Sequence, residues 1–192
     1  MTLPHEVAAT GPAADLAAAL QAALPSITTE RLRLRAPQIE DFAAYAEIML
    51  RPSGRFLFKE PNRRDVWLDF MQMIATWLTR GHGLWSVEAR AGGDVLGFVL
   101  LGLEDGDHEP ELGYMFREAG QGKGYAAEAA HAARAHAFGA LGWTTVVSTI
   151  DPGNAASVRV AERLGASRDA AAEAAHGNEI LVYRHMNQEA AA

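Results

Sequence analysis

Apolar and polar positions alternate near the start of the chain in a way that predicts a β-strand. Leucine and arginine alternate strictly over residues 31–35, so one face of this segment is apolar and the other is charged. Two stretches with helical spacing of apolar residues follow, over residues 41–49 and from Asp65 to Leu78. The first half of the chain therefore predicts one strand followed by two helices.

The second half of the chain predicts a run of strands and then an alternation of strands and helices. Apolar segments indicate strands at 84–89, 95–103, 112–116, 144–150 and 180–183. Helical spacing indicates helices at 125–141 and 154–164, the second ending at Gly165. Antiparallel hairpins followed by a strand–helix–strand pattern are typical of an α+β fold with a mixed sheet.

The first 25 residues differ from the rest of the chain. Leu16, Leu20 and Leu24 recur every four residues within an alanine-rich run that ends at Pro25, which predicts an amphipathic helix. We expect an N-terminal extension over 1–25 and one domain over 26–192. The extension either attaches loosely or covers the domain or a partner subunit.

Composition narrows the classes of function. The chain has 192 residues, enough for one domain with its own core, and a net charge of −7, which disfavours binding to nucleic acid or acidic membranes. With no cysteine, disulfide scaffolds, thiolate–metal sites and cysteine nucleophiles are excluded. No apolar run approaches the ~18 residues of a membrane span, and the first ten residues lack the basic residues of a signal peptide. We expect a cytoplasmic protein.

A glycine-rich turn between a strand and a helix is the most informative segment. Gln121 to Ala126 read Gln-Gly-Lys-Gly-Tyr-Ala and follow the strand predicted at 112–116. Glycines at the start of a helix let a ligand approach free backbone N–H groups, an arrangement that binds phosphate. Because Lys123 is followed by glycine, the turn is not a P-loop. A dinucleotide fingerprint fits superficially, but five residues separate Phe116 from Gly122, and that fingerprint follows its strand at once.

Taken together, these motifs resemble the GNAT superfamily of N-acetyltransferases, in particular the subgroup that contains the ribosomal-protein alanine N-acetyltransferases. The segments that carry the resemblance appear in order over roughly residues 26–186: 29–35, 111–114, 122–129, 151–157 and 162–166. The resemblance implies a mixed, mostly antiparallel central sheet flanked by helices. It also implies acetyl-coenzyme A as acyl donor and direct transfer, within a ternary complex, to a primary amine on a peptide N-terminus or a small molecule.

The resemblance also assigns residues to the acyl donor. Backbone groups around Met115 and Phe116 would pair with the pantetheine arm, and the Met115 amide would polarise the thioester carbonyl. Asn154 would bond the same arm. The pyrophosphate would lie on the glycine-rich turn, formed by Gln121, Gly122, Lys123, Gly124, Tyr125 and Ala126.

Two residues are candidates for proton transfer. Glu111 lies at the start of the strand that leads to the turn, where a carboxylate can deprotonate an incoming ammonium. Many relatives place a tyrosine seven residues after the asparagine to protonate the thiolate, but here that residue is Ala161. The resemblance makes Ser157 the candidate acid, and direct protonation by water is the alternative. The missing tyrosine leaves open a catalytically weak acyl-coenzyme A sensor or interaction module.

The remaining charged residues suggest no metal site. Glu111 ends an acidic cluster that begins at Glu104 and lacks calcium-loop spacing, so it is either a solvated loop or an attractor for a cationic amine. His131 and His136 are five residues apart and form no ligand pair on a helix. We expect no nucleic-acid or membrane partner, and a homodimer is possible.

Overall fold

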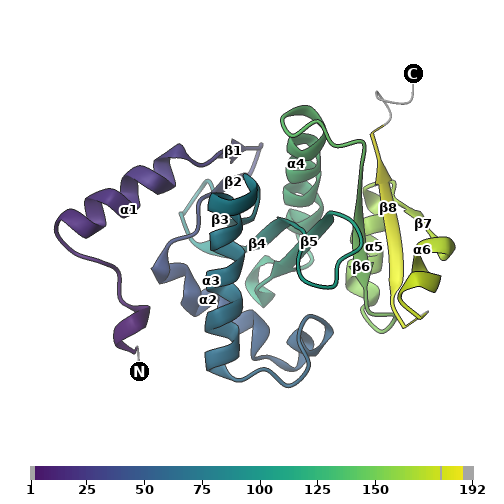
Figure 1. Cartoon of the computed structure of the whole chain (residues 1–192), viewed down its shortest axis with the longest axis horizontal. Helices are drawn as coiled ribbons and strands as arrows, with labels where there is room; N and C mark the ends of the chain where they lie inside the picture. Colours follow the sequence, from purple (N-terminus) through teal and green to yellow (C-terminus); the bar gives the residue numbers. More distant parts are fainter. Residues whose placement is uncertain (1–2, 178, 188–192) are drawn as a thin grey trace.

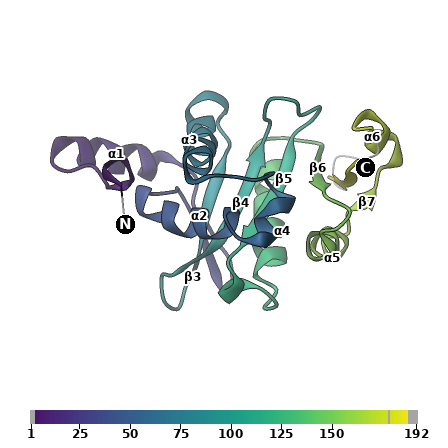
Figure 2. The ribbon, with the colours of Figure 1, turned by 90° about the horizontal axis from the view of Figure 1, so that it is seen from below.

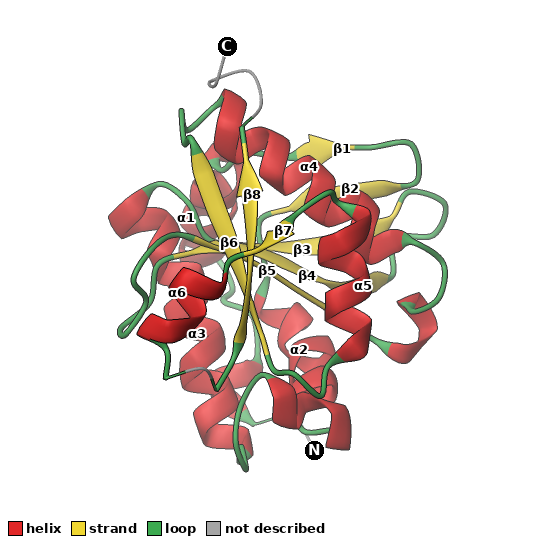
Figure 3. Ribbon diagram, turned by 90° about the vertical axis from the view of Figure 1, so that its right-hand side faces the viewer, coloured by secondary structure: helices red, strands yellow, loops and turns green. Residues whose placement is uncertain are grey.

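An eight-stranded sheet organises the chain in the computed structural model, which describes residues 3–177 and 179–187. The strand order is β1-β2-β3-β4-β5-β6-β8-β7, and all neighbours are antiparallel except β5 and β6 (Figure 1). The predicted mixed, mostly antiparallel sheet is confirmed. Right-handed twist accumulates over the strands, which fan about the centre of the view in Figure 3. The strands are β1 (Ile27–Thr28), β2 (Leu32–Arg35), β3 (Leu84–Ala89), β4 (Val95–Gly102), β5 (Glu111–Phe116), β6 (Thr145–Ile150), β7 (Ser167–Arg168) and β8 (Leu181–Met186).

The helices match the predicted segments, with shifted ends, except α6, which was not predicted. They are α1 (Pro12–Ala23), α2 (Phe42–Met49), α3 (Arg63–Arg80), α4 (Tyr125–Gly139), α5 (Ala155–Arg163) and α6 (Ala170–Ala175). Helix α3 starts before Asp65 because Asn62 caps it: the Asn62 side chain accepts hydrogen bonds from the N–H groups of Arg64 and Asp65 at 3.0 and 3.1 Å. The sequence did not predict β1, β7 and α6, which are too short to show a period.

Helices pack on both faces of the sheet. Along β4, Phe98 and Leu100 join the core under α2 and α3, while the alternate residues Val99 and Leu101 join the core under α4. Four fully buried alanines on α4 let that helix lie close to the strands: Ala129, Ala130, Ala133 and Ala137. The small alanine side chains on the buried face of α4 thus set the distance between the N-terminus of α4 and the end of β5.

The N-terminal extension stands apart from the sheet but is held at its tip. Helix α1 has no buried residue, and Leu16 and Leu20 are 63% and 49% exposed (Figures 1 and 2). Before it, the Glu6 carboxylate accepts hydrogen bonds of 2.7 and 2.8 Å from the Arg63 guanidinium. The predicted helix is therefore present, with Leu16 and Leu20 exposed, while Leu24, just after its end, is half-buried against the core.

The parallel strands β5 and β6 diverge almost as soon as they meet. They are paired only at Glu111 and Val147, where the Val147 N–H donates to the Pro110 carbonyl at 3.0 Å. A continued parallel ladder would next join the Thr149 N–H to the Leu112 carbonyl. Instead the Thr149 N–H donates to Glu111 Oε1 at 3.2 Å, and the Ser148 hydroxyl donates to the Leu112 carbonyl at 2.7 Å. Side chains thus replace ladder bonds at the point where the strands separate.

Candidate active site

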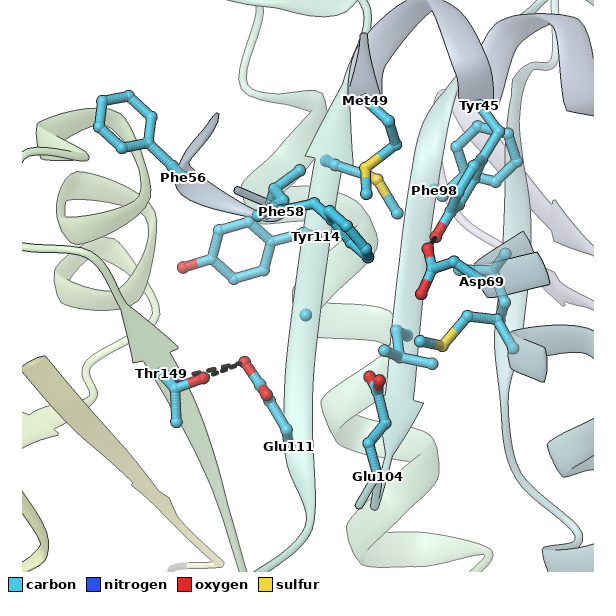
Figure 4. A pocket seen from close by; sticks show the side chains of 16 residues that line it. Tyr45, Met49, Phe56, Phe58, Asp69, Phe98, Glu104, Glu111, Tyr114 and Thr149 are labelled. Atoms are coloured by element: carbon cyan, nitrogen blue, oxygen red, sulfur yellow. Dashed lines mark hydrogen bonds between the residues drawn. The ribbon is translucent and has the colours of Figure 1, made fainter. Parts of the chain in front are cut away.

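A cavity of about 270 Å³ lies beside this separation. One wall is formed by β5 and β6, and α2, α3, β4 and the segment 56–58 form the others (Figure 4). The lining residues are Tyr45, Met49, Phe56, Leu57, Phe58, Asp69, Met73, Leu84, Phe98, Leu100, Glu104, Glu111, Gly113, Tyr114, Met115 and Thr149. Of the residues predicted to act in catalysis or donor binding, Glu111 and Met115 line it.

The Glu111 carboxylate lies at the point where β5 and β6 separate. Its Oε1 atom accepts hydrogen bonds from Thr149 Oγ1 at 2.7 Å and from the Thr149 N–H at 3.2 Å (Figure 4). Burial raises the pKa of Glu111 to about 7, although the two Thr149 hydrogen bonds favour the charged form. A carboxyl group with a pKa near neutrality exchanges a proton readily at pH 7, which suits a general base.

Two further carboxylates face the same cavity. Asp69, on α3, accepts a 2.6 Å hydrogen bond from the Tyr45 hydroxyl, and burial raises the pKa of Asp69. Glu104 follows β4; burial, together with the charges of Asp69, Asp107 and Glu111, raises the pKa of Glu104 to about 7. Asp69 was not predicted, but the sequence contains a signal for it. It lies on the face of α3 that is otherwise buried, three residues after Val66.

The start of α5 brings Asn154, Ser157 and Tyr114 together. Asn154 Oδ1 accepts a 3.1 Å hydrogen bond from the Ser157 N–H and caps the helix. Within the described residues the Asn154 amide donors make no hydrogen bond, so they are available to a ligand. The Tyr114 hydroxyl donates to the Ser157 carbonyl at 2.9 Å. Ala161 is fully buried in a cluster with Ile150 and Tyr183.

The glycine-rich turn has the backbone conformation that the sequence predicts. Gly122 and Gly124 have φ angles of 72° and 80°, values that side chains other than glycine rarely adopt. Gly124 is the N-cap of α4, and no side chain caps the free N–H groups of the first turn. The Gln121 side chain donates to the Phe116 carbonyl at 2.9 Å, which ties the turn to β5. The exposed loop and helix N-terminus fit a phosphate-bearing ligand.

Arg31, just before β2, holds this turn, a contact that sequence reasoning missed. Its guanidinium donates to the Lys123 carbonyl at 2.9 Å, bonds the Glu128 carboxylate at 2.7 Å and lies 4.7 Å from the centre of the Tyr125 ring. A Cβ atom built at Gly124 would lie 3.5 Å from Arg31 and 4.0 Å from Arg163. Two cations therefore flank the turn.

The backbone of Met115 does not face the strand separation, which corrects the predicted role of its amide. A Cβ atom built on Gly97 of β4 would lie 2.4 Å from the Met115 carbonyl oxygen, so the Met115 backbone faces β4. Peptide groups alternate in direction along a strand, so those of Tyr114 and Phe116 face the side where β6 has moved away. Of the two residues predicted to pair with the pantetheine arm, only Phe116 has this orientation.

Comparison with known proteins identifies the family. The model of the acetyltransferase (GNAT) domain matches residues 31–167. The chain belongs to the GNAT acetyltransferase family. It is 30% identical over 147 residues to the uncharacterized protein YkkB of Bacillus subtilis, an alignment that covers 72% of this chain and 83% of that protein.

Solved GNAT structures share the fold over nearly their whole length. An acetyltransferase from Agrobacterium tumefaciens superposes with a TM-score of 0.79 at 34% identity and covers 86% of this chain and 96% of its own. The ribosomal α-N-protein acetyltransferase RimL, in complex with coenzyme A, superposes with a TM-score of 0.66 at 17% identity and covers 84% and 98%. The predicted family, fold and N-acetyltransferase class are confirmed.

Two general properties complete the description of the GNAT chain. Its described helices are all too short or too polar to cross a lipid bilayer. Its described residues contain no group of three or more histidine, aspartate or glutamate side chains placed to hold a metal ion.

Proposed function

We propose that this GNAT protein transfers the acetyl group of acetyl-coenzyme A to a primary amine by direct attack in a ternary complex. One observation carries the proposal: the Glu111 carboxylate, with a pKa of about 7, lies where the cavity meets the separation of β5 and β6. The acyl donor approaches from the glycine-rich turn along β5, and the amine approaches through the cavity. Glu111 lies between the path of the acyl donor and the path of the amine.

The donor-binding part of the proposal uses the turn and the free edge of β5. The N–H groups at 122–126 bind the pyrophosphate, and the cations Lys123, Arg31 and Arg163 lie around it. Tyr114 and Phe116 turn their peptide groups toward the separation, so the pantetheine arm pairs with them as an added strand. The unpaired amide donors of Asn154 bond the same arm from α5.

The chemical part assigns two proton transfers. Glu111 accepts a proton from the ammonium, the amine nitrogen forms a bond to the thioester carbon, and the carbon–sulfur bond then breaks. The departing thiolate takes a proton from Ser157 or from water, and the second proton that the attacking nitrogen loses as the amide forms restores that donor. The amide product and free coenzyme A account for every atom.

Two measurements test this function directly. Calorimetry with acetyl-coenzyme A tests donor binding, and release of free thiol in the presence of a panel of amines tests transfer. Binding together with amine-dependent thiol release supports the proposal. Binding without thiol release for any amine would instead support the sensor that the missing tyrosine left open.

A further inference from the structure

Every ionisable side chain that lines the cavity is an acid. Asp69, Glu104 and Glu111 supply carboxylates from α3, from the segment after β4 and from β5, and Tyr45 and Tyr114 supply phenols. Among the described residues, none of those that line the cavity is a lysine, arginine or histidine. Figure 4 shows Glu104 and Glu111 extending into the same space, with Asp69 at its other side. The electrostatic potential of the cavity therefore favours a cation.

Glu104 is the carboxylate that lacks a partner. Elsewhere in the chain buried carboxylates are paired, as Asp41 is with Arg35. Within the described residues the Glu104 carboxylate forms no hydrogen bond or ion pair; the hydrogen bonds of Glu104 are made by its backbone N–H and carbonyl, both with Asp107. A half-buried carboxylate beside other carboxylates destabilises the folded protein unless a cation arrives. Groups destabilised in this way are typical of binding sites.

The cavity also has no free hydrogen-bond donor among its side-chain hydroxyls. Tyr45 donates to Asp69, Tyr114 donates to the Ser157 carbonyl, and Thr149 donates to Glu111. A peptide carries carbonyl oxygens that need donors when they are buried. An acceptor that brings only N–H donors and methylene groups fits this cavity better than a peptide.

The remaining walls are apolar. Phe56, Phe58, Phe98, Met49 and Met73 surround the space between the carboxylates. Aromatic faces attract ammonium groups, and all five side chains contact methylene groups favourably. A volume of about 270 Å³ limits the acceptor to a short chain.

We infer that the acceptor is a short aliphatic amine with a second positive charge, as in an α,ω-diaminoalkane; the inference rests on the proposed function. One ammonium lies at Glu111, loses its proton and is acetylated. The other stays charged and lies between Asp69 and Glu104. The methylene chain between them packs on the phenylalanine and methionine side chains.

Thiol release at saturating acetyl-coenzyme A tests this inference. Diaminobutane and diaminopentane are compared with butylamine, pentylamine and a short peptide with a free N-terminal alanine. We expect kcat/KM for each diamine to exceed that of the monoamine of equal length about tenfold or more, since a charge-assisted contact contributes that much. The peptide should be the poorest acceptor.

Three variants locate the second charge. Glu104→Gln and Asp69→Asn should each lower the ratio of kcat/KM for diamine to that for monoamine toward one. Asparagine at position 69 still accepts the Tyr45 hydrogen bond, so the fold is retained. Asp105→Asn removes the same charge from an exposed residue of the same loop that does not line the cavity, and it should leave the ratio unchanged.

The outcomes separate this inference from the proposed function. Equal or better use of monoamines or of the peptide would overturn the inference while the transferase function stands. A diamine preference that survives Glu104→Gln and Asp69→Asn would also overturn it. Failure to bind acetyl-coenzyme A, with no thiol release for any amine, would overturn both.

Discussion

At the scale of single residues, the chemistry depends on how the surroundings of Glu111 set its proton affinity. Burial raises its pKa to about 7, and the two hydrogen bonds from Thr149 hold one oxygen in place while the other is left toward the cavity. A glutamate in water, with a pKa near 4.3, is a weak base at pH 7. The fold therefore makes an ordinary side chain suitable for deprotonating an amine.

Glu111→Gln is expected to separate catalysis from donor binding. Glutamine keeps an oxygen that accepts the Thr149 hydrogen bonds but has no basic site. Turnover at pH 7 should fall about 10²–10⁴-fold, the usual contribution of a general base, and acetyl-coenzyme A affinity should persist. In the wild type, kcat/KM should fall as the pH drops through about 7, and this acidic limb should be absent in the variant.

Thr149→Val is the matched control, because it keeps the carboxylate and removes one hydrogen bond. Hydrogen bonds to a carboxylate favour its charged form, so their loss raises the pKa of Glu111 and moves the acidic limb to higher pH. If Glu111→Gln lowers the rate less than threefold, another group deprotonates the amine.

Ser157→Ala is expected to lower kcat more than it weakens donor binding. The hydroxyl is needed only as the thiolate leaves, so its contribution belongs to the transition state. The loss should be modest, about 10–100-fold, because water can supply the proton. Tyr114→Phe is measured alongside, since its hydroxyl bonds the Ser157 carbonyl. A higher dissociation constant with unchanged kcat would show that Ser157 only binds or caps.

At the scale of elements, the donor site that we propose joins the N-terminus of α4 and the free edge of β5 in one continuous surface. The Gln121 side chain ties the turn to the Phe116 carbonyl, and Arg31 ties it to the segment that leads into β2. These contacts fix the turn in one conformation before a ligand arrives, which lowers the entropy lost on binding. Donor affinity therefore depends on residues that lie on three separate elements.

Gly124→Val is expected to weaken acetyl-coenzyme A binding by about tenfold or more. A valine disfavours the φ angle of 80° and places its side chain over the N–H groups that bind phosphate. Calorimetry measures the loss, and circular dichroism checks the fold. Gly142→Val is the control, because it introduces a comparable strain, at a φ angle of 69°, between α4 and β6. Equal affinity for Gly124→Val and wild type would remove the turn from the donor site.

Arg31→Ala is expected to raise the dissociation constant of acetyl-coenzyme A about tenfold. The change removes the hydrogen bond to the Lys123 carbonyl and one cation beside the turn. Arg33→Ala is the control, because Arg33 is equally exposed two residues along and has no contact with the turn. Parallel losses in both variants would indicate a general effect of net charge rather than a specific contact.

At the scale of the whole molecule, the charged carboxylates of the cavity that favour a cationic acceptor also destabilise the folded protein. Burial and neighbouring carboxylates raise the pKa of Glu104 to about 7, above its ordinary value of 4.5. The folded protein therefore binds a proton more tightly than the unfolded chain does. The stability contributed by this protonation is fully present below pH 4.5 and is lost as the pH rises through 7.

Glu104→Gln is therefore expected to raise the melting temperature at pH 8 and to change it little at pH 5. The Glu104 carboxyl opposes folding only when it is ionised, and glutamine at this position carries no charge at either pH. At pH 8 the free energy of unfolding should rise by about 1 kcal/mol after solvent screening, which raises the melting temperature by about 2–4 °C. Differential scanning fluorimetry at both pH values measures it. Asp105→Asn, an exposed residue of the same loop, should show no such pH dependence. A gain of equal size at pH 5 and pH 8 would contradict the argument.

Local patterns were enough to predict the main elements and the donor turn. Strict alternation over 31–35 and the glycines at 122 and 124 impose their conformations through steric constraints within a few residues. Asp69 shows the limit of such reasoning. A carboxylate on the buried face of α3 is visible in the sequence, but its neighbours Tyr45 and Glu104 come from other elements, and no local period joins them.

The sequence by itself therefore determined the order of the longer strands and helices, the conformation of the glycine-rich turn and the family, because local periods, glycine positions and ordered motifs can all be read along the chain. Tertiary structure alone decided which peptide groups face the separation of β5 and β6, since that depends on the register of β5 against β4 and turned Met115 away. It alone also brought Asp69, Glu104 and Glu111 around one cavity. Long-range packing sets both the distance between these charges and their burial, and from these two quantities their proton affinities follow.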